Sequence, residues 1–299
     1  MWLLVVIISQ FANAGSMFLD KLLIAKKFPR PGVLTFVTAL SGLVVLPLIF
    51  WDFNWQPTFK VLVLSLVAGI CFTIALQFFY MALKTGEATH ISPLVGAVVP
   101  IGSLILSYVL LAEKLSNQQY LGVAILVVGA LLISMEKSRR HHGWHIGMVW
   151  AVIAGLFFAG YYVLSRVIYL QDTFSTGFVW GRLGSVLAVL PLLLFPTIRQ
   201  DLFTSSRRKK QQRASGFGWL AVNKLLAAGY FLGMNFAISL TSATLVNALA
   251  GLQYVMLFII MLWSSRFSSR FEKEEFSRME IITQVFALII IVVGIALLI

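Results

Sequence analysis

Cysteine and acidic residues are scarce in this sequence. The single cysteine, Cys71, excludes a disulfide within the chain and a metal site built from several thiolates. Only 11% of the 299 residues are charged, whereas a soluble protein carries roughly 25%. The chain has 11 Asp and Glu residues, and none of them lies deep inside an apolar segment. The sequence therefore argues against a soluble protein and offers no buried carboxylate to a catalytic cluster.

The motifs of several common enzyme classes are missing as well. The sequence contains no Gly-rich loop followed by Lys-Ser or Lys-Thr, no His-Glu-x-x-His and no Gly-x-Ser-x-Gly. These motifs would hold the phosphates of ATP, a zinc ion and a serine nucleophile, respectively. We therefore expect no enzyme activity and no cofactor.

Apolar segments of bilayer-spanning length are abundant. Sixty per cent of the residues are hydrophobic, and the mean hydropathy is +0.92. A bilayer core of about 30 Å needs about 20 apolar residues in a helix, because backbone groups in lipid find partners only within the helix itself. We therefore predict an all-α polytopic membrane protein. Its ten transmembrane helices are expected at residues 1–24, 32–51, 61–83, 91–112, 117–135, 144–168, 174–195, 219–240, 243–263 and 279–299.

The first of these segments resembles a secretory signal, because Ala12-Asn13-Ala14 matches a signal-peptidase site. However, no positive residue precedes the apolar run, and the run continues to Ile24. A signal peptide has a charged start and a shorter apolar core. We expect a retained first helix.

The distribution of positive charge predicts the orientation in the membrane. The net charge of +12 fits short basic loops that face anionic lipid head groups, so membrane lipids rather than nucleic acid are the expected partners. Of the 23 Lys and Arg residues, eighteen lie in the connections that follow odd-numbered segments and three in the even-numbered connections. Because cytoplasmic loops are enriched in Lys and Arg, the odd-numbered connections are predicted to be cytoplasmic. Both termini then lie on the opposite face.

The two halves of the chain resemble each other. At an offset of 155 residues, Ala82, Ala88, Thr89, Leu94, Gly96 and Ile105 match Ala237, Ala243, Thr244, Leu249, Gly251 and Ile260. We predict two five-helix repeats, residues 1–138 and 139–299. Because five is an odd number, two such repeats insert with opposite orientation, as in inverted-repeat transporters.

The sequence is identified as a member of the drug/metabolite transporter superfamily, in its EamA-like branch, on the basis of three stretches. They are 82–88 leading into Val99-Pro100, 111–115 followed by Gly122 and Gly129, and 237–243. The resemblance implies a ten-helix basket around a central cavity that opens alternately to each side, in a cell membrane such as a bacterial inner membrane. It also implies export. Lys21 and Phe28-Pro29-Arg30-Pro31 resemble sugar-phosphate and nucleotide-sugar translocators of the superfamily. Family members are usually drawn with both termini in the cytoplasm, which is opposite to the orientation that the charges predict.

Arg182 is the most unusual ionisable residue, because it lies eight residues into the seventh apolar segment. Ionisable residues at that depth are usually functional, and a guanidinium without a carboxylate at similar depth suggests an anionic group on the substrate. The alternatives are snorkelling to the interface and a structural hydrogen bond to backbone carbonyls of a neighbouring helix. Lys224, five residues into the eighth segment, is a second candidate contact to the same anion, although its long stem also reaches the interface.

Amides and phenols inside the apolar segments form a second group of candidate substrate-binding residues. They are Asn13, Gln77, Tyr80, Tyr161, Asn235, Asn247 and Gln253. Such groups can hydrogen-bond a polar solute, and Tyr161 could stack on a ring. For each residue the alternative is an interhelical hydrogen bond, worth about 0.6 to 2 kcal/mol, or packing against lipid. Tyr80 and Asn235 occupy equivalent positions at the repeat offset.

The three histidines His141, His142 and His145 lie in a short basic loop, which favours a solvated loop over a metal site. The sequence thus predicts a secondary transporter that moves a small polar or amphipathic metabolite by alternating access, driven by protons or by exchange for another solute. One alternative is an anion exchanger of the sugar-phosphate or nucleotide-sugar translocator type. The other is a lipid-handling or structural membrane protein without solute flux.

Overall fold

The computed structural model describes most of the chain. The described residues are 1–23, 30–85, 88–134, 145–203, 217–253, 255–257, 259–260, 286, 289–290, 293–294 and 296–298. Within them the chain is helical and contains no strand, which confirms the predicted all-α class for this part of the molecule. The helices are α1 (Trp2–Leu23), α2 (Pro31–Ser41), η1 (Gly42–Phe50), α3 (Phe59–Thr85), α4 (Ala88–Leu111), α5 (Asn117–Ser134), α6 (Ile146–Tyr169), α7 (Phe174–Val189), η2 (Leu190–Leu194), α8 (Pro196–Phe203), α10 (Phe217–Leu240), α11 (Ala243–Ala248) and η3 (Leu249–Gly251).

Six of the described spans are long and apolar enough to cross a membrane. They are Trp2–Leu19, Pro31–Phe50, Phe59–Thr85, Ile91–Leu111, Ile146–Tyr169 and Phe174–Leu194. Each agrees within a few residues with a segment predicted from the sequence. The tenth predicted segment, 279–299, and the basic connections around Arg139 and Lys209 lie largely or wholly outside the described residues.

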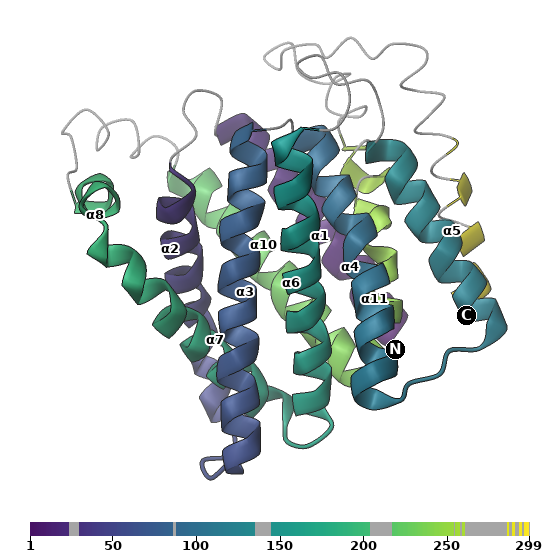
Figure 1. Ribbon diagram of the computed structural model, residues 1–299, viewed down its shortest axis with the longest axis horizontal. Helices are drawn as coiled ribbons and strands as arrows, with labels where there is room; N and C mark the ends of the chain where they lie inside the picture. Colours follow the sequence, from purple (N-terminus) through teal and green to yellow (C-terminus); the bar gives the residue numbers. More distant parts are fainter. Residues whose placement is uncertain are drawn as a thin grey trace.

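The long helices run roughly side by side and alternate in direction along the chain (Figure 1). Helix α3 packs along α6 and α7, α4 packs along α6 and α5, and α1 packs along α10. Both marked ends of the chain lie toward the lower end of the bundle in Figure 1, where η1 also turns into α3 and α6 turns into α7. The core thus forms between helices that are distant in sequence.

The second and seventh predicted segments each change from α-helix to 3₁₀-helix. Helix α2 continues as η1, which contains Pro47, and α7 continues as η2, which has Pro191 in its first turn. Proline lacks a backbone N–H and its ring clashes with the preceding turn, so a regular α-helix does not continue through it. The same four-residue sequence, Val-Leu-Pro-Leu, occurs at 45–48 and 189–192.

Glycines bring α3 and α7 into unusually close contact. A Cβ atom added to Gly69 would lie 2.2 Å from the carbonyl oxygen of Gly181, and one on Gly184 would lie 2.7 Å from the carbonyl oxygen of Leu66. The Ser185 hydroxyl donates a 3.1 Å hydrogen bond to the carbonyl oxygen of Gly69. Small residues allow such backbone approach between helices in a membrane. This contact fixes the position of Arg182, which lies on α7 between Gly181 and Gly184.

Candidate functional site

Arg182 is the ninth residue of α7 and is buried inside the protein. Its side chain is 3% exposed, so it neither faces lipid nor snorkels to the interface. The side chain passes Gly42, where a Cβ atom would lie 3.0 Å from Arg182 Cδ. The absence of a side chain at Gly42 therefore leaves room for the arginine to reach the centre of the bundle.

Aromatic rings surround the guanidinium. Its carbon atom lies 4.2 Å from the ring centroid of Phe72 on α3 and 4.0 Å from that of Phe231 on α10. The centroids of Phe178 and Tyr161 lie 5.4 Å and 5.6 Å away. Aromatic faces attract cations by their quadrupole, most strongly where water is excluded. The rings thus stabilise a positive charge that is buried inside the protein.

A chain of hydrogen bonds continues from the guanidinium to α6 and α10. Arg182 Nη2 donates to the Tyr161 hydroxyl at 2.9 Å, and that hydroxyl donates to Asn235 Oδ1 at 2.7 Å. The Tyr169 hydroxyl also donates to Asn235 Oδ1, at 3.3 Å, and Asn235 Nδ2 donates to the carbonyl oxygen of Phe231 at 2.9 Å. The Arg182 cluster is defined here as Arg182, Tyr161, Asn235, Phe72, Phe178 and Phe231. Three of its members, Tyr161, Arg182 and Asn235, were predicted from the sequence.

The cluster has two unsatisfied features. Arg182 Nε is buried and has no hydrogen-bond partner among the residues that the structure describes. Within the described residues, no Asp or Glu side chain forms an ion pair or hydrogen bond with Arg182. A buried donor without an acceptor costs about 1–3 kcal/mol, and more when it carries charge. The cluster is thus chemically suited to receive an anionic acceptor.

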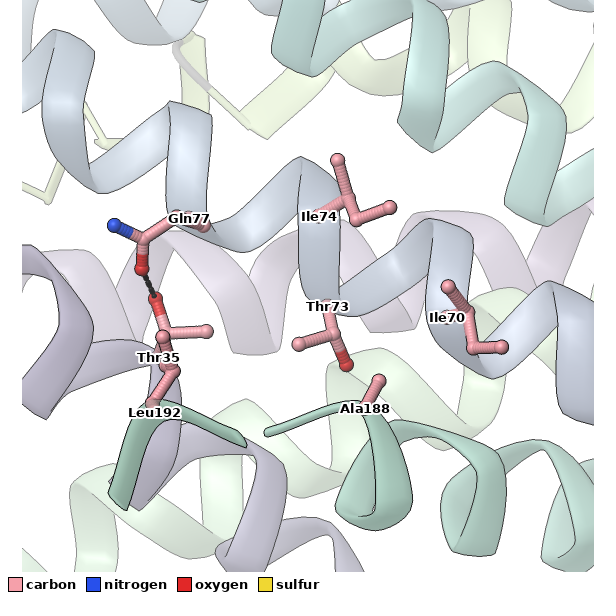
Figure 2. Close-up of a pocket in the computed structure, with 7 residues that line it drawn as sticks. All are labelled: Thr35, Ile70, Thr73, Ile74, Gln77, Ala188 and Leu192. Atoms are coloured by element: carbon pink, nitrogen blue, oxygen red, sulfur yellow. Dashed lines mark hydrogen bonds between the residues drawn. The ribbon is translucent and has the colours of Figure 1, made fainter. Parts of the chain in front are cut away.

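A second polar group joins α2 to α3. The Thr35 hydroxyl donates to Gln77 Oε1 at 2.9 Å, and the hydroxyls of Thr38 and Tyr80 are 2.9 Å apart. A pocket of about 310 Å³ lies beside the Thr35–Gln77 bond, and Figure 2 shows the side chains that line it. It is lined by Thr35, Ile70, Thr73, Ile74, Gln77, Ala188 and Leu192. Gln77 and Tyr80 are therefore placed together, apart from the hydrogen bonds of the Arg182 cluster.

The remaining predicted residues form pairs elsewhere or lie at the surface. Asn13 on α1 donates to Gln253, and Asn247 on α11 donates to the hydroxyl of Ser103 on α4 at 3.1 Å. These are interhelical hydrogen bonds, the alternative considered for each amide. Lys224 on α10 has an exposed side chain, so the structure does not bring it to Arg182 as a second cation.

Sequence reasoning did not single out the three phenylalanines of the Arg182 cluster. Phenylalanine is common in this chain, at 24 residues, and nothing in its spacing separates Phe72, Phe178 and Phe231 from the rings that face lipid. Thr35 and Thr38 were missed for a related reason, because a single threonine in a transmembrane helix usually bonds its own backbone. Only the packing of α2, α3, α6, α7 and α10 against one another identifies these residues.

The lower end of the bundle is closed by contacts between the first and second halves of the chain. The backbone N–H of Asn54 donates to the Thr176 hydroxyl at 2.7 Å, and Asn54 Nδ2 donates to Asp172 Oδ2 at 3.0 Å. The Thr173 hydroxyl donates to the carbonyl oxygen of Asp52 at 2.6 Å. We call these residues, Asp52, Asn54, Asp172, Thr173 and Thr176, the lower latch. They tie the turn before α3 to the turn between α6 and α7.

Comparison with known proteins supports the resemblance seen in the sequence. Residues 1–135 match the EamA-like transporter family. A protein of Bacillus subtilis (strain 168) named as the uncharacterized transporter YwfM is 28% identical over 133 residues, which are 43% of this chain and 45% of that protein. The matched region thus spans less than half of this curated relative.

A solved structure shares the fold of nearly the whole chain. A crystal structure of another protein superposes with a TM-score of 0.62 and covers 97% of this chain and 95% of its own, at 16% sequence identity. At this identity the likeness shows the fold alone. Together with the six apolar helices, the EamA-like match identifies a multi-pass membrane protein.

Proposed function

We propose that this protein is a secondary transporter that exports a small polar or amphipathic metabolite across a cell membrane by alternating access. The observation that carries this proposal is the Arg182 cluster, in which polar and aromatic side chains of α3, α6, α7 and α10 meet inside an EamA-like bundle. Ionisable residues buried in a membrane protein usually mark a substrate or ion pathway. The driving force is a proton gradient or a counter-transported solute.

The helix packing supports two inverted five-helix repeats, residues 1–138 and 139–299. In such an arrangement the first helix is equivalent to the sixth and the third to the eighth. Packing of the first helix on the eighth is therefore equivalent to packing of the sixth on the third. Both pairs are packed, as α1 on α10 and as α6 on α3. Gly122 on α5 also lies against Gly294 near the C-terminus, as expected for equivalent last helices of two repeats. These pairings support the proposed ten-helix fold.

Polar groups recur at related places in the two proposed repeats. Tyr80 bonds a residue of α2, and its counterpart at the repeat offset, Asn235, belongs to the Arg182 cluster with α7. The Val-Leu-Pro-Leu sequence lies in the 3₁₀-helix that follows α2 and at the junction of α7 with η2. In the second proposed repeat the polar group includes Arg182, whereas in the first it consists of hydroxyl and amide groups.

A transport assay tests the proposal. Purified protein is screened against a panel of metabolites by thermal stabilisation, and each stabilising solute is then followed in proteoliposomes. We expect at least one solute to stabilise the protein and to cross the membrane only in its presence. A panel without stabilisation or flux would contradict the proposal and favour a structural or lipid-handling role.

The lower latch is expected to open during transport. Alternating access requires the halves to separate at one face and then at the other. The test uses a double variant, Asn54→Cys with Asp172→Cys, in a Cys71→Ser background. When a short, cleavable thiol cross-linker joins the two cysteines, the protein should lose most of its transport activity, and cleavage of the linker should restore it. Each single cysteine variant treated with the same reagent is the control. Unchanged flux in the cross-linked protein would show that the latch does not move.

The charge distribution leads us to propose that both termini face away from the cytoplasm. Gln56, before α3, and Arg199, on α8, both have exposed side chains. Gln56 lies in a connection that is predicted to be outside the cell, and Arg199 lies in one that is predicted to be cytoplasmic. In a Cys71→Ser background, Gln56→Cys should react with an impermeant maleimide on intact cells, whereas Arg199→Cys should react only after permeabilisation. The reverse pattern would place the termini in the cytoplasm, as family members are usually drawn.

A second candidate function, exchange of one anionic metabolite for another, is favoured by the unpartnered Nε of Arg182. The exposed position of Lys224 reduces the positive charge available to such a solute. The side chain of Lys21, a further contact in this hypothesis, lies outside the described residues.

A further inference from the structure

The Arg182 cluster leaves one charged N–H group ready for a ligand. The arginine is 3% exposed, and its Nε atom is buried without a hydrogen-bond partner, while Nη2 is held by Tyr161. A buried charged donor is unfavourable unless an acceptor binds it. The bulk of the side chain is nevertheless fixed by Gly42, Phe72 and Phe231. The Nε–H group is therefore a preorganised hydrogen-bond donor for an acceptor on a ligand that binds reversibly.

The direction of approach is restricted by the rings. Phe72 and Phe231 lie 4.2 Å and 4.0 Å from the guanidinium carbon, and their ring centroids are 5.1 Å apart, so they lie on neighbouring rather than opposite sides of the guanidinium. The Nε–H bond lies in the guanidinium plane. A carboxylate presents two oxygens in one plane and pairs with such an edge by two parallel hydrogen bonds. An oxyanion with two acceptor oxygens therefore suits this edge.

The charge of the cluster limits the charge of the ligand. Arg166, the other arginine on α6 and α7, donates to the carbonyl oxygens of Ile238 and Ser239 and interacts electrostatically with Glu113. Lys224 is exposed. Among the described residues, Arg182 thus brings one uncompensated positive charge to the rings. A monoanion balances it, whereas a dianionic phosphate leaves a second negative charge in a medium of low dielectric constant.

The same reasoning excludes an ammonium group on the ligand. In the described part of the chain, no acidic side chain contacts Arg182, Tyr161 or Asn235. An ammonium placed beside the guanidinium would meet a like charge without a carboxylate to offset it. The neighbouring rings of Phe178 and Tyr161, and that of Phe158 against Phe72, instead offer apolar surface.

We propose that the Arg182 cluster binds the carboxylate of a monocarboxylic acid that has an apolar body and no ammonium group. This proposal rests on the proposed transport function and names its substrate class. The carboxylate accepts from Nε in the guanidinium plane, and the apolar body lies against the rings of the cluster. Sugar phosphates and nucleotide sugars, which carry more charge and polar bodies, fit the cluster poorly.

Four matched probes test the substrate class with purified full-length protein. They are 3-phenylpropionate, its neutral amide, the zwitterion L-phenylalanine and the dianion 2-phenylethyl phosphate. Binding is measured by calorimetry and thermal stabilisation at pH 7.5. We expect 3-phenylpropionate to bind at least tenfold more tightly than each of the other three. Arg182→Gln should remove this preference, whereas Lys224→Gln, which removes a cation at the exposed face of α10, should retain it.

The outcomes separate this proposal from the transport function. Equal or tighter binding of the phosphate, the zwitterion or the amide would overturn the monocarboxylate assignment, as would a carboxylate preference that survives Arg182→Gln. Failure of all four probes to bind would also overturn it. In each of these cases, flux of another solute from the metabolite panel would leave the transport function standing.

Discussion

Replacing Arg182 with glutamine is expected to abolish transport of the solute while leaving thermal stability almost unchanged. Two unit charges 4 Å apart interact by about 4 kcal/mol at an effective dielectric constant of 20, so loss of the guanidinium should weaken binding of an anion by a factor on the order of 100 to 1,000. The variant loses the bond to Tyr161 and stacking on Phe72 and Phe231. It also removes a buried charge whose Nε has no partner, which offsets that loss.

The measurements are flux in proteoliposomes and the melting temperature of the purified variant. Arg182→Lys keeps the charge but lacks the planar fork, so we expect it to lose at least tenfold in transport. Lys224→Gln is the matched control, because it removes one cation from an exposed position of α10 and should transport normally. Normal flux in Arg182→Gln would show that the arginine has a purely structural role.

The depth of Arg182 could be predicted from the sequence, but its surroundings could not. Counting residues into an apolar segment places a side chain along the membrane normal, because a helix rises by a fixed 1.5 Å per residue. It does not say which face of the helix meets which neighbour. The structure shows that Gly42 admits the side chain and that Phe72 and Phe231 cover the guanidinium, and these residues come from three different helices.

For the amides, too, the sequence predicts the position along the membrane normal but not the neighbours. Asn13, Asn247 and Gln253 belong to apolar segments as predicted, yet the structure shows them in interhelical hydrogen bonds apart from those of Arg182. Asn235, of the same chemical type, is part of the cluster. Composition alone does not distinguish the two cases, because a buried amide is satisfied equally well by a neighbouring helix or by a solute.

The helix boundaries were predictable for a physical reason, since the length of an apolar run is set by the thickness of the bilayer. Two exceptions are the ends of α2 and α7, where Pro47 and Pro191 convert the last turns to 3₁₀-helix. A third is the ninth predicted segment, in which α11 passes into η3 after Ala248. Both prolines are visible in the sequence. Proline changes the hydrogen bonding of the helix but hardly changes its hydropathy, so the hydrophobicity of the segments did not predict the change to 3₁₀-helix.

The close packing of α3 on α7 leads to the second large expected effect, a strong loss of stability in Gly69→Ala. The added methyl group would lie 2.2 Å from the carbonyl oxygen of Gly181 and 2.5 Å from the backbone nitrogen of Ser185. Both are backbone atoms of a packed helix, so no side chain can rotate away and the two helices must separate. Overpacking of this kind costs about 1–3 kcal/mol.

Separation of the helices also weakens two hydrogen bonds that cross between them. The Thr73 hydroxyl donates to the carbonyl oxygen of Ser185 at 3.1 Å, and the Ser185 hydroxyl donates to that of Gly69 at 3.1 Å. Each such bond is worth about 0.6 to 2 kcal/mol in a membrane protein. Together with the overpacking, these losses should lower the melting temperature of the purified protein by roughly 5–10 °C.

Gly160→Ala on α6 is the matched control for this prediction. It adds the same methyl group to another transmembrane helix, at a position where a Cβ atom meets nothing within 4 Å. Because alanine favours the helical conformation by up to about 1 kcal/mol over glycine, the control should melt at an unchanged or slightly higher temperature. A difference in melting temperature between Gly69→Ala and Gly160→Ala of less than about 2 °C, which is on the order of the assay error, would show that the helices are not in the close contact described.

Gly69→Ala should also reduce binding of the solute, because Arg182 lies on α7 between Gly181 and Gly184. Separation of the helices would displace the guanidinium from Tyr161 and from the two rings that hold it.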